Sequence, residues 1–232
     1  NGFVPGEGGG CVVLKPLSRA LVDGDQIHAV IRGSAVNHGG RSNGYTVPSP
    51  AAQRDVIRAA LVQAGVKAED ISYIEAHGTG TELGDPIEVE GLTQAFQVDT
   101  DKRGFCALGS IKSVLGHLEA AAGIAGLSKV ILQMKHATLA PTRHVAHTNP
   151  NIDFATTPFT VQREAAPWPA SRPQIAGISS FGAGGANAHL IVEAWPDNKD
   201  GASTANASAT LQAVTLSARD PEQLRNQAER LL

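Results

Sequence analysis

The sequence contains few cysteines and few aromatic residues. Only two of its 232 residues are cysteines, Cys11 and Cys106, and Phe, Trp and Tyr together account for 4% of the chain. Two cysteines cannot build a disulfide framework, and their small number fits a reducing compartment. The sequence therefore predicts a cytoplasmic protein whose 25 glycines and 13 prolines make it rich in loops and close backbone contacts.

The chain also lacks an excess of basic charge and any long apolar run. It has 19 Lys and Arg against 22 Asp and Glu, a formal net charge of −3. This balance gives no reason to expect nucleic acid or an anionic membrane as a partner. No uninterrupted apolar run reaches the roughly 18 residues that a membrane span needs. With 42% hydrophobic and 18% charged residues, the composition is that of a globular protein with a sizeable core.

Strand and helix patterns alternate along most of the chain, which predicts an α/β fold. Strands are expected at 11–14, 26–36, 71–76, 105–109, 159–161, 174–179 and 188–193, and helices at 50–64, 85–96 and 117–135. Asp85-Pro86-Ile87-Glu88 has the pattern of a helix start, with a cap, a first-turn proline and a capping-box glutamate. The helix at 117–135 is apolar on nearly every face, so we expect it to be buried all round.

Both ends of the sequence suggest a piece of a longer protein. The chain opens in a glycine-rich loop, Asn1 to Gly8, which is an unusual place for a domain to begin. Residues 197–210 are rich in Ala, Ser, Thr and Asn and are expected to form a flexible linker. Residues 211–216 are expected to form a strand, and a helix that starts near Asp220 continues to the last residue.

Three loops combine chemically reactive side chains with glycine. They are His77-Gly-Thr-Gly-Thr81, Lys112-Ser-Val-Leu-Gly-His117 and Phe181-Gly-Ala-Gly-Gly185, and each follows an expected strand. Loops at the carboxyl ends of parallel strands meet at one edge of a sheet. We therefore expect the two histidines, the lysine and several free backbone N–H groups to lie close together.

These side chains suit the stabilisation of a developing negative charge on oxygen. Taken singly, each is more simply explained as a structural histidine or a surface lysine. A histidine at the start of a helix is disfavoured as a cation, and the charge of Lys112 would lower the pKa of a neighbouring imidazole. Two neutral imidazoles that donate hydrogen bonds, with a cation nearby, predict an oxyanion-binding site made of His77, His117 and Lys112.

Two other kinds of site are weaker alternatives. Gly78-x-Gly80-x-x-x-Gly84 follows a strand and precedes a helix, as in dinucleotide-binding loops. Asp85 would place a carboxylate where the pyrophosphate has to lie, and Pro86 removes an N–H donor there. His136, His144 and His147 could hold a metal ion, but no cysteine or carboxylate stands at ligand spacing beside them. We therefore expect neither a bound nucleotide nor a metal site.

Several runs resemble the β-ketoacyl synthase domains of modular polyketide synthases. They are Glu75-Ala-His-Gly-Thr-Gly-Thr81, Gly109-Ser-Ile-Lys-Ser-Val-Leu-Gly-His-Leu-Glu119, Ser179-Ser-Phe-Gly-Ala-Gly-Gly-Ala-Asn-Ala-His189 and Gly2-Phe-Val-Pro-Gly-Glu-Gly8. The resemblance covers residues 1–196, which would form the C-terminal part of the domain. The run Val36-Asn-His-Gly-Gly-Arg-Ser-Asn-Gly44 also matches. Its part Asn37-His38-Gly39-Gly40 and the glycine-rich loop at 182–187 are most similar to ketosynthases whose acyltransferase acts in trans.

This resemblance implies a thiolase-like fold, an α/β fold of two similar halves that usually forms a homodimer. The chain would hold the C-terminal half with the end of the N-terminal half, and residues 211–232 would begin a linker subdomain. The nucleophilic cysteine of the family would lie in the upstream half, because neither Cys11 nor Cys106 stands in the family's motif. The expected partners are that upstream half, acyl carrier protein domains and a trans-acting acyltransferase.

The resemblance also implies a reaction and a role for each site residue. An acyl chain on the upstream cysteine would condense with malonyl-acyl carrier protein as CO₂ is lost. His77 and His117 resemble the catalytic histidines, and Lys112 resembles the lysine that tunes their electrostatics. Thr79 and Thr81 resemble the hydroxyls that contact the phosphopantetheine arm of the carrier protein. No cofactor would be bound directly.

Ala183 departs from the pattern of many single-function relatives, which carry Phe there as a gate over the acyl pocket. The backbone N–H at this position would form half of an oxyanion hole, and alanine keeps that donor while removing the gate. Some relatives lack the second histidine and only transfer or hold chains. Such a non-extending, transacylating or scaffolding ketosynthase is the alternative function, but the presence of His117 favours condensation.

Overall fold

The computed structural model describes residues 2–40, 47–196 and 216–229. The chain divides into two compact units, Asn1–Trp195 and Pro196–Leu232. In the second unit the described residues form helix α6 (Pro221–Glu229), and Asp220 Oδ1 accepts the N–H of Gln223 at 2.8 Å, so the expected helix start is confirmed. The linker expected at 197–210, and the strand expected at 211–216 except for Leu216, lie outside the described residues.

The first unit is built on a six-stranded mixed sheet with the order β1-β8-β7-β2-β3-β5. The four strands β7, β2, β3 and β5 are parallel, and β8 is antiparallel to both β1 and β7. The strand bounds are β1 Ala29–His38, β2 Tyr73–Glu75, β3 Cys106–Gly109, β5 Phe159–Val161, β7 Ile175–Phe181 and β8 Ala186–Ala194. The expected α/β fold is confirmed. The strand expected at 26–36 is β1, which begins at Ala29 and ends at His38.

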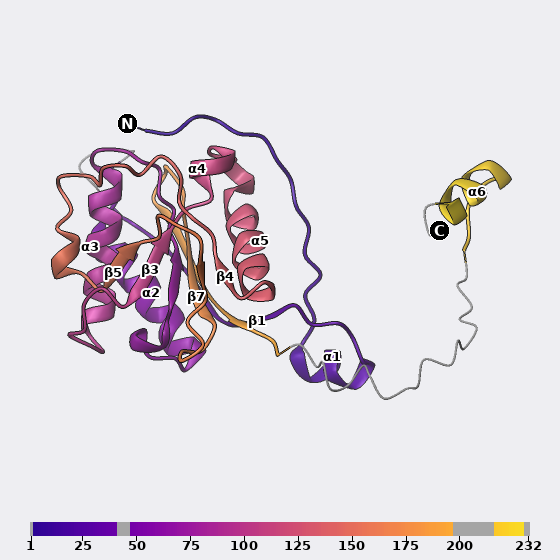
Figure 1. Cartoon of the computed structure of the whole chain (residues 1–232), viewed down its shortest axis with the longest axis horizontal. Helices are drawn as coiled ribbons and strands as arrows, with labels where there is room; N and C mark the ends of the chain where they lie inside the picture. The colour runs from indigo at the N-terminus through magenta and orange to yellow at the C-terminus, as the bar shows by residue number, and fades with distance from the viewer. Residues whose placement is uncertain (1, 41–46, 197–215, 230–232) are drawn as a thin grey trace. The chain divides into compact units, whose positions relative to one another are not determined.

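Helices cover both faces of this sheet (Figure 1). Helices α2 (Pro50–Ala64) and α3 (Gly84–Gln97) lie on one face, and α5 (Ala122–Lys135) lies on the other. Ser49 accepts the N–H of Ala52 at the start of α2, and Gly65 ends this helix in the left-handed conformation, as the sequence predicts. In the described residues no helix is both long and apolar enough to cross a membrane.

The helix expected to begin at His117 begins at Ala122. A short helix α4 (Lys112–Leu115) precedes it where a turn is expected, and a 3₁₀ helix (Glu119–Ala121) takes the place of the first turn of the expected helix. Gly116 separates the two with a φ of +74°, which interrupts any continuous helix.

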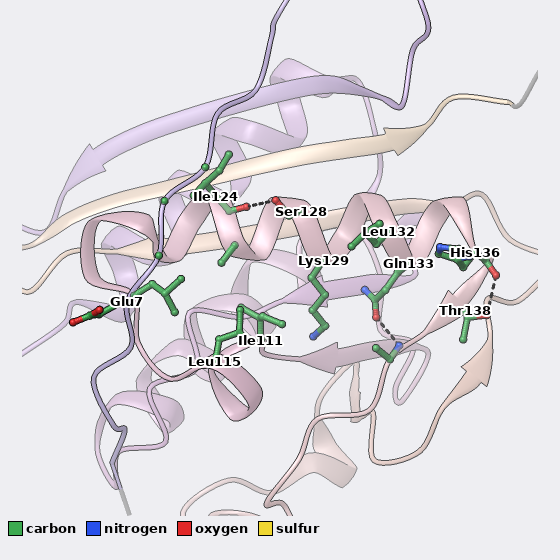
Figure 2. A pocket seen from close by; sticks show the side chains of 16 residues that line it. Glu7, Ile111, Leu115, Ile124, Ser128, Lys129, Leu132, Gln133, His136 and Thr138 are labelled. Atoms are coloured by element: carbon green, nitrogen blue, oxygen red, sulfur yellow. Dashed lines mark hydrogen bonds between the residues drawn. The ribbon is translucent and has the colours of Figure 1, made fainter. Parts of the chain in front are cut away.

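The expectation that helix α5 is buried on every side is also wrong. Leu132 is 54% exposed and Ser128 is exposed. The outer side of α5, the N-terminal segment at Glu7 and the α4 loop at Ile111 and Leu115 line an open, largely apolar groove of about 620 Å³ (Figure 2). The apolar residues on this side therefore line a groove instead of packing in the core.

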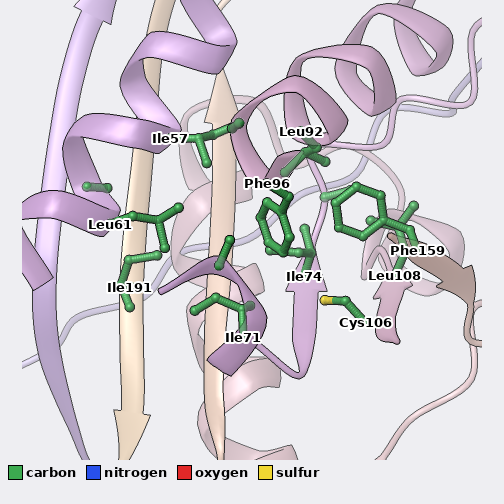
Figure 3. Packing of buried hydrophobic residues seen from close by; sticks show 14 of the residues in the cluster. Ile57, Leu61, Ile71, Ile74, Leu92, Phe96, Cys106, Leu108, Phe159 and Ile191 are labelled. Atoms are coloured by element: carbon green, nitrogen blue, oxygen red, sulfur yellow. The ribbon is translucent and has the colours of Figure 1, made fainter. Parts of the chain in front are cut away.

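The larger core lies between the sheet and the α2–α3 layer (Figure 3). Its central side chains are fully buried: Ile57, Leu61, Ile74, Leu92, Phe96, Cys106, Phe159 and Ile191. The rings of Phe96 and Phe159 meet edge to face with their centroids 5.0 Å apart. A smaller core joins α5 to the opposite face of the sheet through residues such as Val130, Met134 and Ile178.

Two further local expectations are wrong. Residues 11–14, expected as a strand, are irregular and exposed, and Val13 is 98% exposed. Within the described residues no strand pairs with this apolar segment, and apolar β-branched residues alone do not make a strand without a partner. The segment is followed by α1 (Leu17–Asp23), which no pattern had indicated. A two-stranded ribbon, β4 (Thr138–Leu139) with β6 (Ala166–Pro167), adds order to a region expected to be irregular apart from β5.

The register of the parallel strands decides where the three glycine-containing loops lie. Tyr73 of β2 pairs with Ala107 of β3 and with Ala176 of β7. The carboxyl ends of β2, β3 and β7 therefore lie at the same edge of the sheet. The loop of His77 follows β2, the loop of Lys112 follows β3 and the loop of Ala183 follows β7.

Candidate active site

His77 follows β2 in a loop that a buried carboxylate holds in place. The two oxygens of Glu88, on α3, accept the backbone N–H groups of His77 at 2.7 Å and Gly78 at 2.8 Å. Glu88 is only 5% exposed, and burial raises its pKa to about 7 although the two hydrogen bonds oppose the rise. Gly78 has a φ of +49°, so the loop turns where a side chain would be strained and would collide with Ser110.

The capping box expected at Asp85–Glu88 is wrong. Helix α3 begins at Gly84, whose N–H bonds to the hydroxyl of Thr81 at 3.0 Å. Asp85 Oδ1 accepts the N–H of Gly80 at 3.0 Å, and Glu88 reaches the His77 loop as described above. The two carboxylates therefore accept hydrogen bonds from the preceding loop instead of capping their own helix.

His117 follows Gly116 and is 8% exposed. The N-terminal segment runs alongside it: His117 N–H donates to the Val4 carbonyl at 2.8 Å, and Gly6 N–H donates to the His117 carbonyl at 2.9 Å. The ring of Phe3 lies against the imidazole with centroids 4.7 Å apart. A Cβ at Gly116 would lie 2.7 Å from the Val4 oxygen, so this close approach requires glycine. The N-terminal loop thus forms one wall of the site.

The structure brings the two imidazoles together. The ring centroids of His77 and His117 are 5.3 Å apart and the ring planes are nearly perpendicular. The N–H of Phe181 donates to Nδ1 of His77 at 3.3 Å, and the N–H of Glu119 donates to Nδ1 of His117 at 2.9 Å. Because Nδ1 of each ring is an acceptor, the neutral form of each ring carries its proton on Nε2. Each ring therefore has an Nε2–H that can donate to a ligand.

Both imidazoles are held neutral. Burial, the charge of Lys112 and the neighbouring His117 lower the pKa of His77 from 6.5 to about 3. Burial and the charge of Lys112 also lower the pKa of His117, and Glu119 partly opposes this. The expectation that a helix start lowers the pKa of His117 is wrong, because α5 begins five residues later, at Ala122. Burial lowers the pKa of Lys112 as well, against four carboxylates that raise it.

The third loop joins β7 to β8 as a tight hairpin. Gly182 N–H donates to the Ala186 carbonyl at 2.7 Å, and Gly185, with a φ of +95°, donates to the Gly182 carbonyl at 2.9 Å. Ala183 is exposed at the tip, two residues beyond the Phe181 amide that bonds His77. Within the described residues its N–H has no hydrogen-bond partner, so this N–H is available to a ligand.

The hydroxyls of Thr79 and Thr81 lie beside the first histidine. Their Oγ1 atoms are 3.2 Å apart, and Thr81 also accepts the Gly84 N–H. The exposed Cys11 is in the N-terminal segment. Cys106, the first residue of β3, is buried in the core, and burial raises the pKa of its thiol. Sequence reasoning identified the histidines, the lysine and the threonines, but it did not assign Glu88 or Phe3 to the site.

The geometry argues against a dinucleotide site in the His77 loop. Three of its backbone N–H groups, those of His77, Gly78 and Gly80, already donate to carboxylates. A phosphate in this loop would have to displace those carboxylates and would be repelled by them. In the part of the chain that the structure describes, no three His, Cys, Asp or Glu side chains gather in an arrangement that could hold a metal ion, and this includes His136, His144 and His147.

Two family models together match nearly the whole chain. Residues 28–146 match the C-terminal domain of β-ketoacyl synthases, and residues 148–232 match the C-terminal extension of ketoacyl synthetases. The boundary between the two matches is not a boundary in the fold. Strands β5, β7 and β8 fall in the range of the extension, yet they belong to the same sheet as β1, β2 and β3.

Among curated proteins, the chain is 52% identical over 243 residues to polyketide synthase PksL of Bacillus subtilis and 56% identical over 240 residues to polyketide synthase ThaG of Burkholderia thailandensis. Each match covers 100% of this chain but only 5% and 4% of the relative, respectively. The chain thus spans a small fraction of the length of these proteins.

Among solved structures, the ketosynthase from module 6 of the bacillaene synthase of Bacillus subtilis 168 superimposes with a TM-score of 0.86 at 44% identity. It covers 99% of this chain, and this chain covers 41% of it. The OzmH KS7 ketosynthase domain of Streptomyces albus JA3453 gives a TM-score of 0.79 at 44% identity, over 93% of this chain and 36% of its own. These neighbours share the thiolase-like fold. The chain therefore belongs to the β-ketoacyl synthase family and is the C-terminal part of a ketosynthase domain of the modular polyketide synthase type.

Proposed function

We propose that this part of the ketosynthase supplies the imidazole pair for a decarboxylative Claisen condensation. The observation that carries the proposal is the pairing of His77 and His117 at 5.3 Å, each neutral and each with Nδ1 bonded to a backbone N–H. Two neighbouring Nε2–H groups suit the stabilisation of an oxygen on which negative charge develops.

In the proposed reaction a malonyl thioester breaks the bond between its α-carbon and its carboxylate, and CO₂ leaves. The electron pair of that bond forms a thioester enolate, whose oxygen accepts hydrogen bonds from His77 and His117. The α-carbon then attacks the carbonyl of an acyl chain on a cysteine of the upstream half, and the cysteine thiolate leaves. Burial and the charge of Lys112 both lower the imidazole pKa values and so favour the neutral rings.

Three residues would bind the substrates. The exposed N–H of Ala183 would stabilise the tetrahedral oxyanion formed on the acyl carbonyl, together with the N–H of the cysteine. The hydroxyls of Thr79 and Thr81 would contact the phosphopantetheine arm that brings the malonyl group. The arm belongs to the substrate, so the chain would bind no cofactor of its own.

The proposal extends to partners and location. The upstream half of the domain supplies the cysteine, an acyl carrier protein delivers the malonyl group, and the complete domain forms a homodimer. The similarity of the glycine-rich loop at 182–187 to trans-acyltransferase systems supports a trans-acting acyltransferase as a further partner in the pathway. The two cysteines of the chain, one exposed and one buried, are both free, which suits a cytoplasmic protein.

The proposed function is tested on the complete ketosynthase domain. We expect it to release CO₂ from malonyl-acyl carrier protein and to form a β-ketoacyl thioester when its cysteine is acylated. The measurement is labelled CO₂ together with the mass of the carrier-bound product. Transfer of the acyl chain without any release of CO₂ would support the alternative, a ketosynthase that passes chains on without extending them.

We expect Ala183→Phe to slow the reaction selectively for large primers. The substitution keeps the backbone N–H and adds a ring at the exposed tip of the hairpin. Acylation with a short primer should then proceed at nearly the parental rate, and acylation with a long or branched primer should slow. The measurement is the acylation rate against primer length, beside a melting curve. Equal losses for all primers with a lower melting temperature would instead mean overpacking, which costs roughly 1–3 kcal/mol.

A further inference from the structure

A buried ion pair involves Glu75, the last residue of β2, which stands two residues before His77. Lys129, on α5, donates from Nζ to Glu75 Oε2 at 2.8 Å and to the Tyr73 hydroxyl at 2.7 Å, and that hydroxyl donates to the same Glu75 oxygen at 2.7 Å. Tyr73 is fully buried, Glu75 is 2% exposed and Lys129 is 8% exposed. Figure 2 shows Lys129 extending from α5 below the groove. A charged pair in such a place is costly to bury unless it is fully hydrogen-bonded.

The second oxygen of Glu75 bonds to a different loop. Glu75 Oε1 accepts the backbone N–H of Ile111 at 2.6 Å. Ile111 immediately precedes Lys112 and α4, and Glu75 is two residues before His77. Glu75 is therefore connected to two of the three loops of the site: to the His77 loop through its own strand, and to the Lys112 loop through this hydrogen bond. The loop of Lys112 also ends at His117, so the same contact acts on the second imidazole.

The ion pair gives this carboxylate a fixed orientation and a partner of opposite charge. Lys129 and Tyr73 both bind Oε2, which leaves Oε1 directed at Ile111. Lys129 compensates the charge of Glu75 inside the core. The cation whose charge lowers the pKa of both imidazoles is Lys112, which acts in addition to burial.

We propose that Tyr73, Glu75 and Lys129 form a positioning cluster that sets the distance between the His77 loop and the loop running from Lys112 to His117. The cluster touches no substrate and acts through the Ile111 N–H. The inference rests on the proposed function for its effect on catalysis, but the loop tether itself is a property of the fold. Small displacements of catalytic groups have large effects on rate, so loss of the tether should be visible in turnover.

The test compares two double variants of the complete ketosynthase that differ at one side chain. Glu75→Gln/Lys129→Met removes both buried charges but keeps an amide oxygen to accept the Ile111 N–H. Glu75→Leu/Lys129→Met removes both charges and the tether. Neither variant leaves an unpaired buried charge, so both can fold, and melting curves check this.

We expect the Gln variant to decarboxylate malonyl-acyl carrier protein within about threefold of the parental kcat, and the Leu variant to lose about tenfold or more. KM and the acylation rate of the cysteine should change little in either, because the cysteine lies in the other half of the domain. Hydrogen exchange of the peptide 110–117 should accelerate in the Leu variant only. This exchange experiment needs no activity, so it tests the tether even if the parent releases no CO₂ and the proposed function fails.

Equal decarboxylation and equal exchange in the two variants would overturn the positioning cluster. A parallel loss of acylation and decarboxylation in the Leu variant would also overturn it, because that result means general destabilisation. Faster exchange of 110–117 in the Leu variant, with decarboxylation lowered and acylation kept, supports it.

Discussion

Replacing His117 with alanine in the complete ketosynthase should abolish decarboxylation and leave acylation of the upstream cysteine measurable. The Nε2–H of His117 is one of two neutral donors aimed at the enolate oxygen, and its Nδ1 is engaged by the Glu119 N–H. Removal of one such donor from a preorganised site costs about a hundredfold or more in rate. The measurement is CO₂ release from malonyl-acyl carrier protein beside mass-spectrometric detection of the acyl-enzyme.

The matched control for this experiment is His136→Ala. His136 is exposed at the end of α5, and no contact connects it with the imidazole pair among the described residues. The His136→Ala variant should release CO₂ from malonyl-acyl carrier protein at the parental rate. If His117→Ala releases CO₂ as fast as the parent, His117 has no part in enolate stabilisation and the proposed mechanism is wrong.

The second large effect concerns Glu88 and the dependence of stability on pH. The pKa of Glu88 rises from its ordinary 4.5 to about 7 in the folded protein because the carboxyl is buried. A carboxyl with a raised pKa binds a proton on folding, so its contribution to stability is fully present below pH 4.5. That contribution is lost as the pH rises through 7. The difference of about 2.5 pKa units corresponds to about 3 kcal/mol.

Glu88→Gln should therefore flatten the pH dependence of stability. From pH 4.5 to 7.5 the free energy of unfolding of the parent should fall relative to that of the variant. The measurement is denaturant unfolding of the complete domain at several pH values. Glu90→Gln is the control, because Glu90 is on the same helix but exposed, and it should reproduce the parental curve. Parallel curves for parent and Glu88→Gln would show that Glu88 does not titrate with a raised pKa.

Much of the fold was predictable from local patterns. Alternating and helical periodicities predicted the main strands and the helices α2 and α3, because each element buries one face and repeats it along the chain. The failures have a common cause. Residues 11–14 have the composition of a strand but no pairing partner among the described residues, and the Lys112–Ala121 region contains two short helices that the turn at Gly116 separates. Neither outcome can be read from periodicity, since both depend on contacts with other segments.

For the site, the sequence by itself determined which groups are present: two histidines, a lysine and glycine-rich loops, each after a strand. Only the tertiary structure decided that they work as a pair of neutral donors. The proton of His77 is placed on Nε2 by the N–H of Phe181, which is 104 residues away in the sequence. The hydrogen bond from Ile111 to Glu75 likewise depends on the parallel register of β2 and β3, and the role of Glu88 as anchor of the His77 loop depends on the position of α3 beside that loop. These contacts depend on how the elements are placed in space, so no local pattern contains them.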